Sequence, residues 1–592
     1  MKQFQFDPGD PPDFKSLGAY GIIGDSRTAA LVGADGSIDW ACLPDFDSPS
    51  VFGSLLDPTA GRLVVRPSSP YTAWQRYERG TNVLVTEFST SSGTVRLRDF
   101  MPYIPHRTVP TAEIYRRVEV VRGNVDLEVI FEPRFDYGLV TPEMERDDYG
   151  VRATDEEGQT LVLSTELPVE IRDGYAVARA TLHGGQETYI VSDWGAANVH
   201  PVATYQCDRR LWQVRTFWRN WVDRMPYHGR YRDAIERSLL TLKLLTFEPT
   251  GAIVAAPTMS LPEWPGGPRN WDYRYSWVRD SAFILRVLFQ AQYMEEGTAY
   301  FDWLLGQALE GGPLQVMYGI RGERFLPERE LPLRQHHLDV YGGLLDAARR
   351  YDQEGGLLTI TEWEKLAAIT NEVYERWEEP DAGIWETRNE PRHYTYSKIW
   401  AWVALTRAVQ LAEQLRADAP ITKWRREAER VRQQVLEEAW DPEVEAFTQS
   451  YEGNALDTSV LVMPTVGFLR ASDDRFQSTL DTCLERLEAG EYPLVYRYLS
   501  EDGVGGPEGA FLLPSFWIVE ALALSGDLSK ARAALSMLME HMNPLGLYAE
   551  EVHPEEGDLL GNFPQGFSHL GFVNATFRLE ELKRTQESWQ EI

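Results

Sequence analysis

Apolar and polar residues alternate with a period of two along the first part of the chain. Val83 and Val85 alternate with polar residues, and so do Val95 and Leu97 on the other side of a short turn. The turns that separate such segments are Ser-Ser-Gly at 91–93, Gly-Asn at 123–124 and Asp-Gly at 173–174. This alternation is typical of antiparallel strands that bury one face, so we predict an antiparallel sandwich over residues 1–200.

From residue 229 the apolar positions change to a helical spacing. Ile235, Leu239, Leu242 and Leu245 recur three and four residues apart and therefore lie on one face of a helix. The same signal predicts about twelve helices, at 229–246, 279–293, 295–310, 336–352, 358–377, 394–416, 421–439, 457–468, 474–488, 509–525, 528–541 and 566–584. Six helix hairpins that close into a ring would use all of them. We therefore predict an all-α barrel whose long connections carry the chemistry.

A segment rich in Trp and Arg separates the two halves. It reads RRLWQVRTFWRNWVDRM at 209–225, which predicts a helix that joins them. The predicted organisation is a β-sandwich domain at 1–200, a helical linker at 201–228 and a helical barrel at 229–592.

The charge of the chain excludes two classes of partner. Lys and Arg total 58 against 90 for Asp and Glu, a net charge of −32. Such a chain repels the phosphates of nucleic acids and of anionic membranes, so we predict neither as a partner. The N-terminus has no apolar run of signal-peptide length, and we expect a cytoplasmic protein. The sequence leaves a homo-oligomer open.

Nothing in the sequence predicts a cofactor or a metal. The three cysteines, Cys42, Cys207 and Cys483, are far apart and form no metal-ligand pair. No HExxH motif occurs, and the glycines near residue 505 lack the context of a phosphate loop.

One aromatic loop combines ring faces with charged edges. The stretch LPEWPGGPRNWDYRYSWVRD at 261–280 contains Tyr273, Tyr275 and Trp277 next to the pair Arg279 and Asp280. Arginine and carboxylate side chains bind neighbouring sugar hydroxyls as donor and acceptor, while aromatic rings cover the apolar face of a sugar. The loop therefore favours a sugar pocket. The alternative is that Asp280 only caps the following helix.

The stretch DAGIWETRNEPRHYTYSK at 381–398 contains a candidate general acid. Glu386 directly follows Trp385. An apolar wall against a carboxyl disfavours its charged form and raises its pKa, as a general acid at neutral pH requires. An ordinary solvated glutamate is the alternative.

Two further stretches supply carboxylates. In LGLYAEEVHPEEGDLLGNFPQGFSH at 545–569, Glu550 or Glu551 is positioned to activate a water, although an acidic hairpin would look similar. In GVGGPEGAFLLPSFW at 503–517, Glu508 and Trp517 lie near another helix start. Glu508 is predicted to bind a hydroxyl or to support the site, and a carboxylate that only begins the helix is the alternative.

At these residues the sequence resembles glycoside hydrolase family 15. The resemblance covers nearly the whole chain, from GIIGDSRTAALVGADGSIDWACLPDFDSPSVFGSLLD at 21–57 through WDYRYSWVRDSAF at 271–283, GIWETRNEPRHYTYSK at 383–398 and EGAFLLPSFW at 508–517 to AEEVHPEEGDLLGNFPQGFSH at 549–569. It implies a β-supersandwich joined by a helical linker to an (α/α)6 barrel. Glucoamylases usually have Ser at the position of Ala549, and Glu551 replaces their Gln.

The resemblance also implies roles for individual residues. Glu386 takes the position of the general acid, and Glu550 takes that of the general base, in preference to Glu551. Arg279 and Asp280 would bind the terminal glucose, with Tyr273, Tyr275, Trp277 and Trp385 around it.

The implied activity is inverting hydrolysis that releases β-glucose from the non-reducing end of a small, soluble α-linked gluco-oligosaccharide. An α,α-trehalase of the same family is the main alternative. Two more distant alternatives are a disaccharide phosphorylase, which needs no general base, and a non-catalytic carbohydrate-binding protein.

Overall fold

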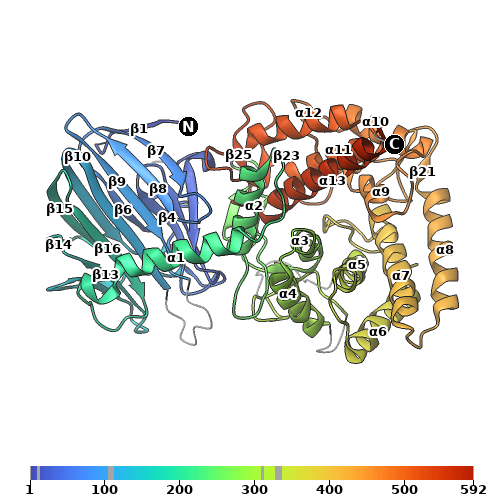
Figure 1. Ribbon diagram of the computed structural model, residues 1–592, viewed down its shortest axis with the longest axis horizontal. Helices are drawn as coiled ribbons and strands as arrows, with labels where there is room; N and C mark the ends of the chain where they lie inside the picture. Colours follow the sequence, from blue (N-terminus) through green and yellow to red (C-terminus); the bar gives the residue numbers. More distant parts are fainter. Residues whose placement is uncertain (1, 10–13, 104–111, 309–312, 327–336, 591–592) are drawn as a thin grey trace.

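The structure is a computed structural model that describes residues 2–9, 14–103, 112–308, 313–326 and 337–590 (Figure 1). The β-strands gather at one end of the molecule and the helices at the other. The predicted fold, an antiparallel β domain followed by a helical barrel, is confirmed, whereas the boundaries at 200 and 228 stay a prediction. Among the described residues, no helix combines the length and the apolar character that a membrane crossing requires.

The β domain is a single antiparallel network that bends into two layers. Its strands are β1 (Phe4–Phe6), β2 (Tyr20–Gly24), β3 (Ala29–Gly33), β4 (Ser37–Cys42), β5 (Ser50–Phe52), β6 (Arg62–Pro67), β7 (Tyr71–Tyr77), β8 (Leu84–Ser89), β9 (Gly93–Phe100), β10 (Ala112–Glu132), β11 (Glu143–Asp147), β12 (Gly150–Thr154), β13 (Thr160–Thr165), β14 (Val169–Arg172), β15 (Tyr175–His183) and β16 (Glu187–Trp194). The path β1-β7-β8-β9-β10-β16-β13-β12-β11 forms one layer. Strands β2 to β6, β14 and β15 join it through β10.

The long strand β10 connects the two layers. Its first part pairs with β9 and β16, and its second part, from Asn124, pairs with β15 and β6. A register shift between Val120 and Arg122 marks a bulge, which bends the strand. Gly123 has a φ of 71°, and a Cβ there would lie 2.1 Å from the carbonyl oxygen of Ser92.

The turn predicted at 123–124 is therefore wrong, because the chain continues through it as one strand. The alternation on either side looks the same for a hairpin and for a bulged strand. The turns predicted at 91–93 and 173–174 are confirmed as the connections of β8 to β9 and of β14 to β15.

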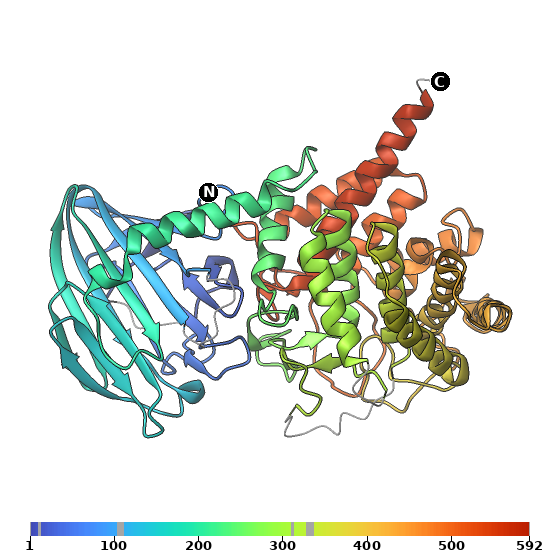
Figure 2. The ribbon, with the colours of Figure 1, turned by 60° about the horizontal axis from the view of Figure 1, so that its bottom comes forward.

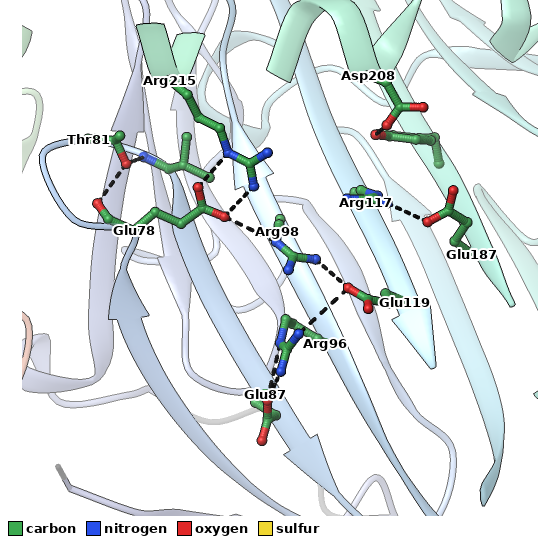
Figure 3. Close-up of polar contacts among 12 residues, drawn as sticks. Glu78, Thr81, Glu87, Arg96, Arg98, Arg117, Glu119, Glu187, Asp208 and Arg215 are labelled. Atoms are coloured by element: carbon green, nitrogen blue, oxygen red, sulfur yellow. Dashed lines mark hydrogen bonds and ion pairs between the residues drawn. The ribbon is translucent and has the colours of Figure 1, made fainter. Parts of the chain in front are cut away.

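Helix α1 (Cys207–Val222) is fixed to the sheet by ion pairs (Figure 3). Both Nε and Nη2 of Arg215 bind the carboxylate of Glu78 at 2.6 Å. Glu78 also accepts a hydrogen bond from Arg98, which in turn lies 2.6 Å from Glu119 of β10. The charges thus form a ladder that runs from the helix across neighbouring strands.

The other end of α1 is fixed to the barrel. The ring of Trp221 stacks on Tyr293 with 4.0 Å between centroids, and its Nε1 donates to Glu296 at 2.5 Å. The linker is therefore a packed helix that contacts both domains.

The second domain is a double ring of helices. They are α2 (Arg232–Leu244), α3 (Val278–Gln290), α4 (Met294–Gln307), α5 (Asp339–Gln353), α6 (Ile360–Arg376), α7 (Thr395–Leu415), α8 (Ile421–Glu438), α9 (Met463–Val466), α10 (Asp474–Arg486), α11 (Leu512–Leu524), α12 (Leu528–Leu538) and α13 (Gly566–Gln590), whose far end projects beyond the barrel (Figure 2). Helix α3 packs on α5, α5 on α7, α11 on α13 and α13 on α3. The short helix η4 (Thr458–Val462), continued by α9, contacts α7 and α11 and closes this inner ring.

Outer helices alternate with the inner ones along the chain, so the inner helices run in the same direction and their N-terminal ends share one end of the barrel. The single helix predicted at 457–468 is instead the 3-10 helix η4 followed by one turn of α9. Pro464 lies in the first turn of α9, where its missing N–H favours a break from the preceding segment.

Short strands lie in the connections: β17 (Met259–Pro262), β18 (Asn270–Asp272), β19 (Ser276–Trp277), β20 (Met317–Tyr318), β21 (Trp440–Asp441), β22 (Ala446–Phe447), β23 (Ala510–Phe511), β24 (Glu551–Val552) and β25 (Leu559–Leu560).

Candidate active site

The predicted site residues lie in connections that lead into inner helices. Tyr273 and Trp277 precede α3, Glu386 precedes α7, Glu508 precedes α11 and Glu550 precedes α13. Because the inner helices run in the same direction, these connections meet at one end of the barrel.

The β domain supports the connection that precedes α3. The guanidinium of Arg274 is buried and binds Asp272 at 2.7 Å, the carbonyl oxygen of Ser48 at 2.8 Å and the hydroxyl of Tyr137 at 2.9 Å. Ser48 and Tyr137 belong to the β domain. The neighbouring Tyr273 points to Glu550 instead, so this connection is held from both sides.

Glu550 is enclosed and directed by two donors. Its residue is 1% exposed, and its carboxylate accepts the hydroxyl of Tyr273 at 2.5 Å and the backbone N–H of Asn562 at 3.3 Å. A Cβ on Gly561 would lie 2.5 Å from Glu550 Oε2, so only glycine permits this approach. Burial, reinforced by the charge of Glu263, raises the pKa of Glu550 to about 8.

Glu386 lies at a more open position opposite an arginine. Its side chain is 23% exposed and accepts a hydrogen bond from Arg279 Nη2 at 2.8 Å. Arg279 also pairs with the buried Asp339 at 3.6 Å. Burial raises the pKa of Glu386, although Arg279 opposes the shift. The backbone of Glu386 has a φ of 54°, an uncommon left-handed conformation that the surrounding contacts maintain.

A second buried carboxyl fixes the loop of Glu386. Asp381 accepts the backbone N–H of Gly383 at 3.3 Å and that of Leu338, just before α5, at 3.1 Å. Burial, together with the charge of Asp339, raises its pKa to about 7. Asp381 thereby connects the loop of Glu386 to the helix that carries the partner of Arg279.

Aromatic rings form one wall of the site. Trp385 packs against Phe511 at 5.7 Å and against Trp517 at 6.2 Å between centroids, and its Nε1 donates to Asp457 at 2.9 Å. Trp517 is buried behind Trp385. Two further rings of the site, Tyr273 and Trp277, meet edge to face with 5.8 Å between centroids.

A cluster of charges lies beside this wall. Ligand-type oxygens of Glu263, Glu508 and Glu551 lie within 4.8 Å of one another, which is the one group in the described residues with the geometry of a metal site. Arg497 occupies the centre, because its guanidinium contacts Glu508 and lies 3.4 Å from Glu263. The same guanidinium lies 5.4 Å from the ring centroid of Trp385. The positive charge of Arg497 therefore already balances part of the negative charge of these carboxylates, and the same side chain contacts the ring of Trp385.

Within that cluster, Glu551 is placed differently from Glu550. It is fully buried and accepts the backbone N–H of Gly509 at 2.8 Å. Burial, with the charges of Glu263 and Glu508, raises the pKa of Glu551 well above its usual range.

Models of known protein families match both parts of the chain. Residues 229–577 match the model described as glycosyl hydrolases family 15, and residues 14–218 match a trehalase-like N-terminal domain. The chain belongs to glycosyl hydrolases family 15. The predicted family and the predicted class, a glycoside hydrolase, are thus confirmed.

Several known proteins resemble the chain over nearly its full length. "Trehalase" of Thermoplasma volcanium is 36% identical and covers 96% of this chain and 94% of its own. "Trehalase" of Mycolicibacterium smegmatis is 37% identical, over 97% of this chain and 93% of its own. A bacterial glucoamylase complexed with acarbose superposes with a TM-score of 0.75 at 12% identity, over 98% of this chain and 97% of that one, which shows a shared fold.

In this family 15 chain the structure brings together most of the predicted residues. Tyr273 with Glu550, Arg279 with Glu386, and Trp385 with Trp517 are in contact. Tyr275 is half-buried on the same connection. The side chain of Asp280, the third residue of α3, lies outside the described residues.

Sequence reasoning missed Arg497, Glu263 and Asp381. Arg497 lies in an unremarkable stretch, LVYRY, and its partner Glu263 is 234 residues away. Glu263 offered a signal, because it falls inside the aromatic loop at 261–280.

Proposed function

We propose that the protein hydrolyses α,α-trehalose with inversion, with Glu386 as general acid and Glu550 as general base. The similarity of both domains to proteins named trehalase, at 36% and 37% identity over nearly the full length, carries the choice of substrate. It favours the trehalase alternative over a longer α-linked oligosaccharide.

The environment of Glu386 supports its role as the acid. Burial of Glu386 favours its protonated form, and its partial exposure lets the glycosidic oxygen approach. Arg279 favours the proton transfer, because its hydrogen bond stabilises the carboxylate of Glu386 that forms once the proton has left.

The environment of Glu550 supports its role as the base. The hydroxyl of Tyr273 and the N–H of Asn562 fix the orientation of the carboxylate, so that it takes a proton from a water on the face opposite Glu386. The ionised form is the active one. Because its pKa is raised to about 8, activity increases as pH rises towards that value.

A cavity next to the loop of Glu386 is suited to the departing glucose. It has a volume of about 730 Å³, and Trp264, Arg269, Tyr496 and Glu508 contribute to its lining. Its wall at 498–508 contacts the loop of Glu386, since the backbone carbonyl oxygen of Asp502 accepts the N–H of Arg388 at 2.8 Å. The general acid faces the leaving group, so this wall lies on the side where the second glucose would leave.

A substrate panel tests the proposal. The values of kcat/KM for trehalose, maltose, isomaltose and maltotriose are measured with purified protein, with and without phosphate. We expect trehalose to exceed the others by at least tenfold. A preference for maltose or maltotriose would make the protein a glucoamylase, and glucose 1-phosphate that appears only with phosphate would make it a phosphorylase.

A further inference from the structure

Asp339 is a buried carboxyl next to the proposed general acid. It is the first residue of α5 and is only 2% exposed. Its Oδ2 lies 3.6 Å from Nη1 of Arg279, and Nη2 of the same guanidinium donates to Glu386 at 2.8 Å. Arg279 therefore binds two carboxyls at once, Glu386 through one nitrogen and Asp339 through the other.

Arg279 alone would be an unsuitable neighbour for a general acid. A guanidinium at hydrogen-bond distance favours the ionised form of a carboxyl, whereas a general acid has to keep its proton until the leaving oxygen approaches. The pKa of Glu386 is nevertheless raised: burial raises it, Arg279 opposes that shift, and the negative charge of Asp339 raises it again. Asp339 thus offsets part of the effect of Arg279 on Glu386.

The start of α5 keeps Asp339 in place and charged. The backbone N–H of Leu338, the residue before it, donates to Asp381 at 3.1 Å. Burial raises the pKa of Asp339, but Arg279 and the N–H groups of the first turn of α5 oppose that shift. A helix N-terminus stabilises a negative charge, so Asp339 is placed where its ionised form is favoured.

Three further charged groups face this arrangement from neighbouring elements. Arg497 lowers the pKa of Glu386 in the same sense as Arg279. Asp381, in the loop before α7, has its pKa raised to about 7 by burial and by the charge of Asp339, and Lys398 of α7 opposes that shift. The Nζ of Lys398 donates to the carbonyl oxygens of Trp377 and Glu379 at 2.5 Å. Asp381 therefore takes up a proton near neutral pH, and this leaves Asp339 as the nearest negative charge to Arg279.

We propose that Asp339 is a positioning residue for the general acid, because it holds Arg279 against Glu386 and balances the guanidinium charge, so that Glu386 keeps its proton until the leaving oxygen takes it. The proton passes from Glu386 to the glycosidic oxygen as the bond to the anomeric carbon breaks, and Arg279 stays hydrogen-bonded to the new carboxylate. Asp339 itself exchanges no proton. The inference rests on the role proposed for Glu386 and adds what controls that role.

The pH dependence of Asp339→Asn on two substrates tests the inference. Fluoride leaves α-glucosyl fluoride without a proton, so the limb of kcat/KM that appears with trehalose and not with this substrate belongs to Glu386. In Asp339→Asn the charge of Arg279 is no longer balanced, and this limb should move to lower pH by about one unit. At pH values above the limb, kcat/KM for trehalose should fall about tenfold, whereas that for α-glucosyl fluoride should stay near the wild-type value.

Three more variants separate the charge from the shape of the side chain. Asp339→Ala is a second neutral variant and should give the same shift. Asp339→Glu keeps the charge, so the limb should stay at its wild-type pH even if kcat falls. Glu354→Gln removes the same charge at an exposed position at the end of α5 and should leave both profiles unchanged.

The inference is overturned if the limb keeps its wild-type pH in both neutral variants or moves to higher pH. It is also overturned if both substrates lose activity equally or if neither neutral variant folds, because Asp339 would then only support the structure. Glu386→Gln distinguishes this failure from that of the proposed function. If Glu386→Gln still hydrolyses trehalose, Glu386 is not the acid; if it is inactive while the limb of Asp339→Asn does not move, only the role of Asp339 is refuted.

Discussion

The two ends of the barrel interior contain opposite excesses of charge. At the N-terminal ends of the inner helices, four carboxyls accompany two guanidiniums: Glu263, Glu508, Glu550 and Glu551 with Arg497 and Arg269. Two or more turns further along, four guanidiniums accompany three carboxylates: Arg286, Arg350, Arg407 and Arg578 with Asp346, Glu520 and Glu581.

Burial has opposite consequences at the two ends. It raises the pKa of Glu550 to about 8, so carboxyls at the active end hold and exchange protons near neutral pH. It lowers the pKa of Arg286 to about 10, which still leaves the guanidinium charged at neutral pH, so this end exchanges no protons there. The same helices thus carry acid and base groups at one end and, further along, ion pairs that stabilise the fold.

The largest effect is expected at the general acid. Glu386→Gln should lower kcat for trehalose by roughly 10²- to 10⁴-fold, because the leaving oxygen is no longer protonated. Hydrolysis of α-glucosyl fluoride should survive in this variant, since fluoride leaves without a proton. Glu550→Gln should lose both activities. Initial rates on the two substrates check this prediction.

The matched control is Glu390→Gln, an exposed residue of the same loop, which should keep wild-type rates. Glu551→Gln should lose less activity than Glu550→Gln, because Glu551 contacts neither Tyr273 nor Asn562. A greater loss in Glu551→Gln would reverse the assignment of the base.

At the other end, the expected effect is on stability alone. Asp346→Asn should lower the free energy of unfolding by about 3 kcal/mol at pH 7, because it leaves Arg407 and Arg350 without the carboxylate, only 14% exposed, that both bind. Urea denaturation measures the loss, and kcat/KM for trehalose should stay unchanged under native conditions. Asp418→Asn, an exposed position, is the control.

The stability that Asp346→Asn loses should become smaller as the pH falls. Burial raises the pKa of Asp346, but Arg407 and Arg350 outweigh it and hold that pKa at about 2, below its value of about 4 in an unfolded chain. Its stabilisation is therefore complete above about pH 4 and is lost as pH falls towards 2. A stability difference that stays constant down to pH 2 would contradict the ion pair.

The smallest effect is a shift in the pH profile. The charge of Glu263 helps to raise the pKa of Glu550, so Glu263→Gln should lower that pKa and move the acid limb of kcat/KM to lower pH. Glu555→Gln, which is exposed, should leave the profile in place. An acid limb that moves to higher pH would show that Glu263 acts by another route.

The sequence predicted those parts of the fold that leave a periodic signal. Strand alternation and helical spacing gave the two domains, and most helices lie within a few residues of their predicted spans. The turn at 123–124 was wrong, because a glycine serves a bulge as readily as a hairpin. The helix at 457–468 was interrupted at Pro464, where the missing N–H outweighs the apolar pattern.

For the site, local composition was informative only where several chemical groups are neighbours in sequence. Tyr273 and Arg279 share one loop with three tryptophans, so they were found. Arg497 was not, because its importance arises from carboxylates that meet only after folding, from Glu263, Glu508 and Glu551.

The most direct test of the central claim is the fate of each anomeric carbon of trehalose. Hydrolysis in water enriched in ¹⁸O, followed by NMR at early times, separates the two glucose products. Attack by water from the face opposite the acid predicts equal α- and β-glucose, with the label only in the β-anomer. Label in α-glucose, with no early β-glucose, would mean retention and would contradict the roles of Glu386 and Glu550.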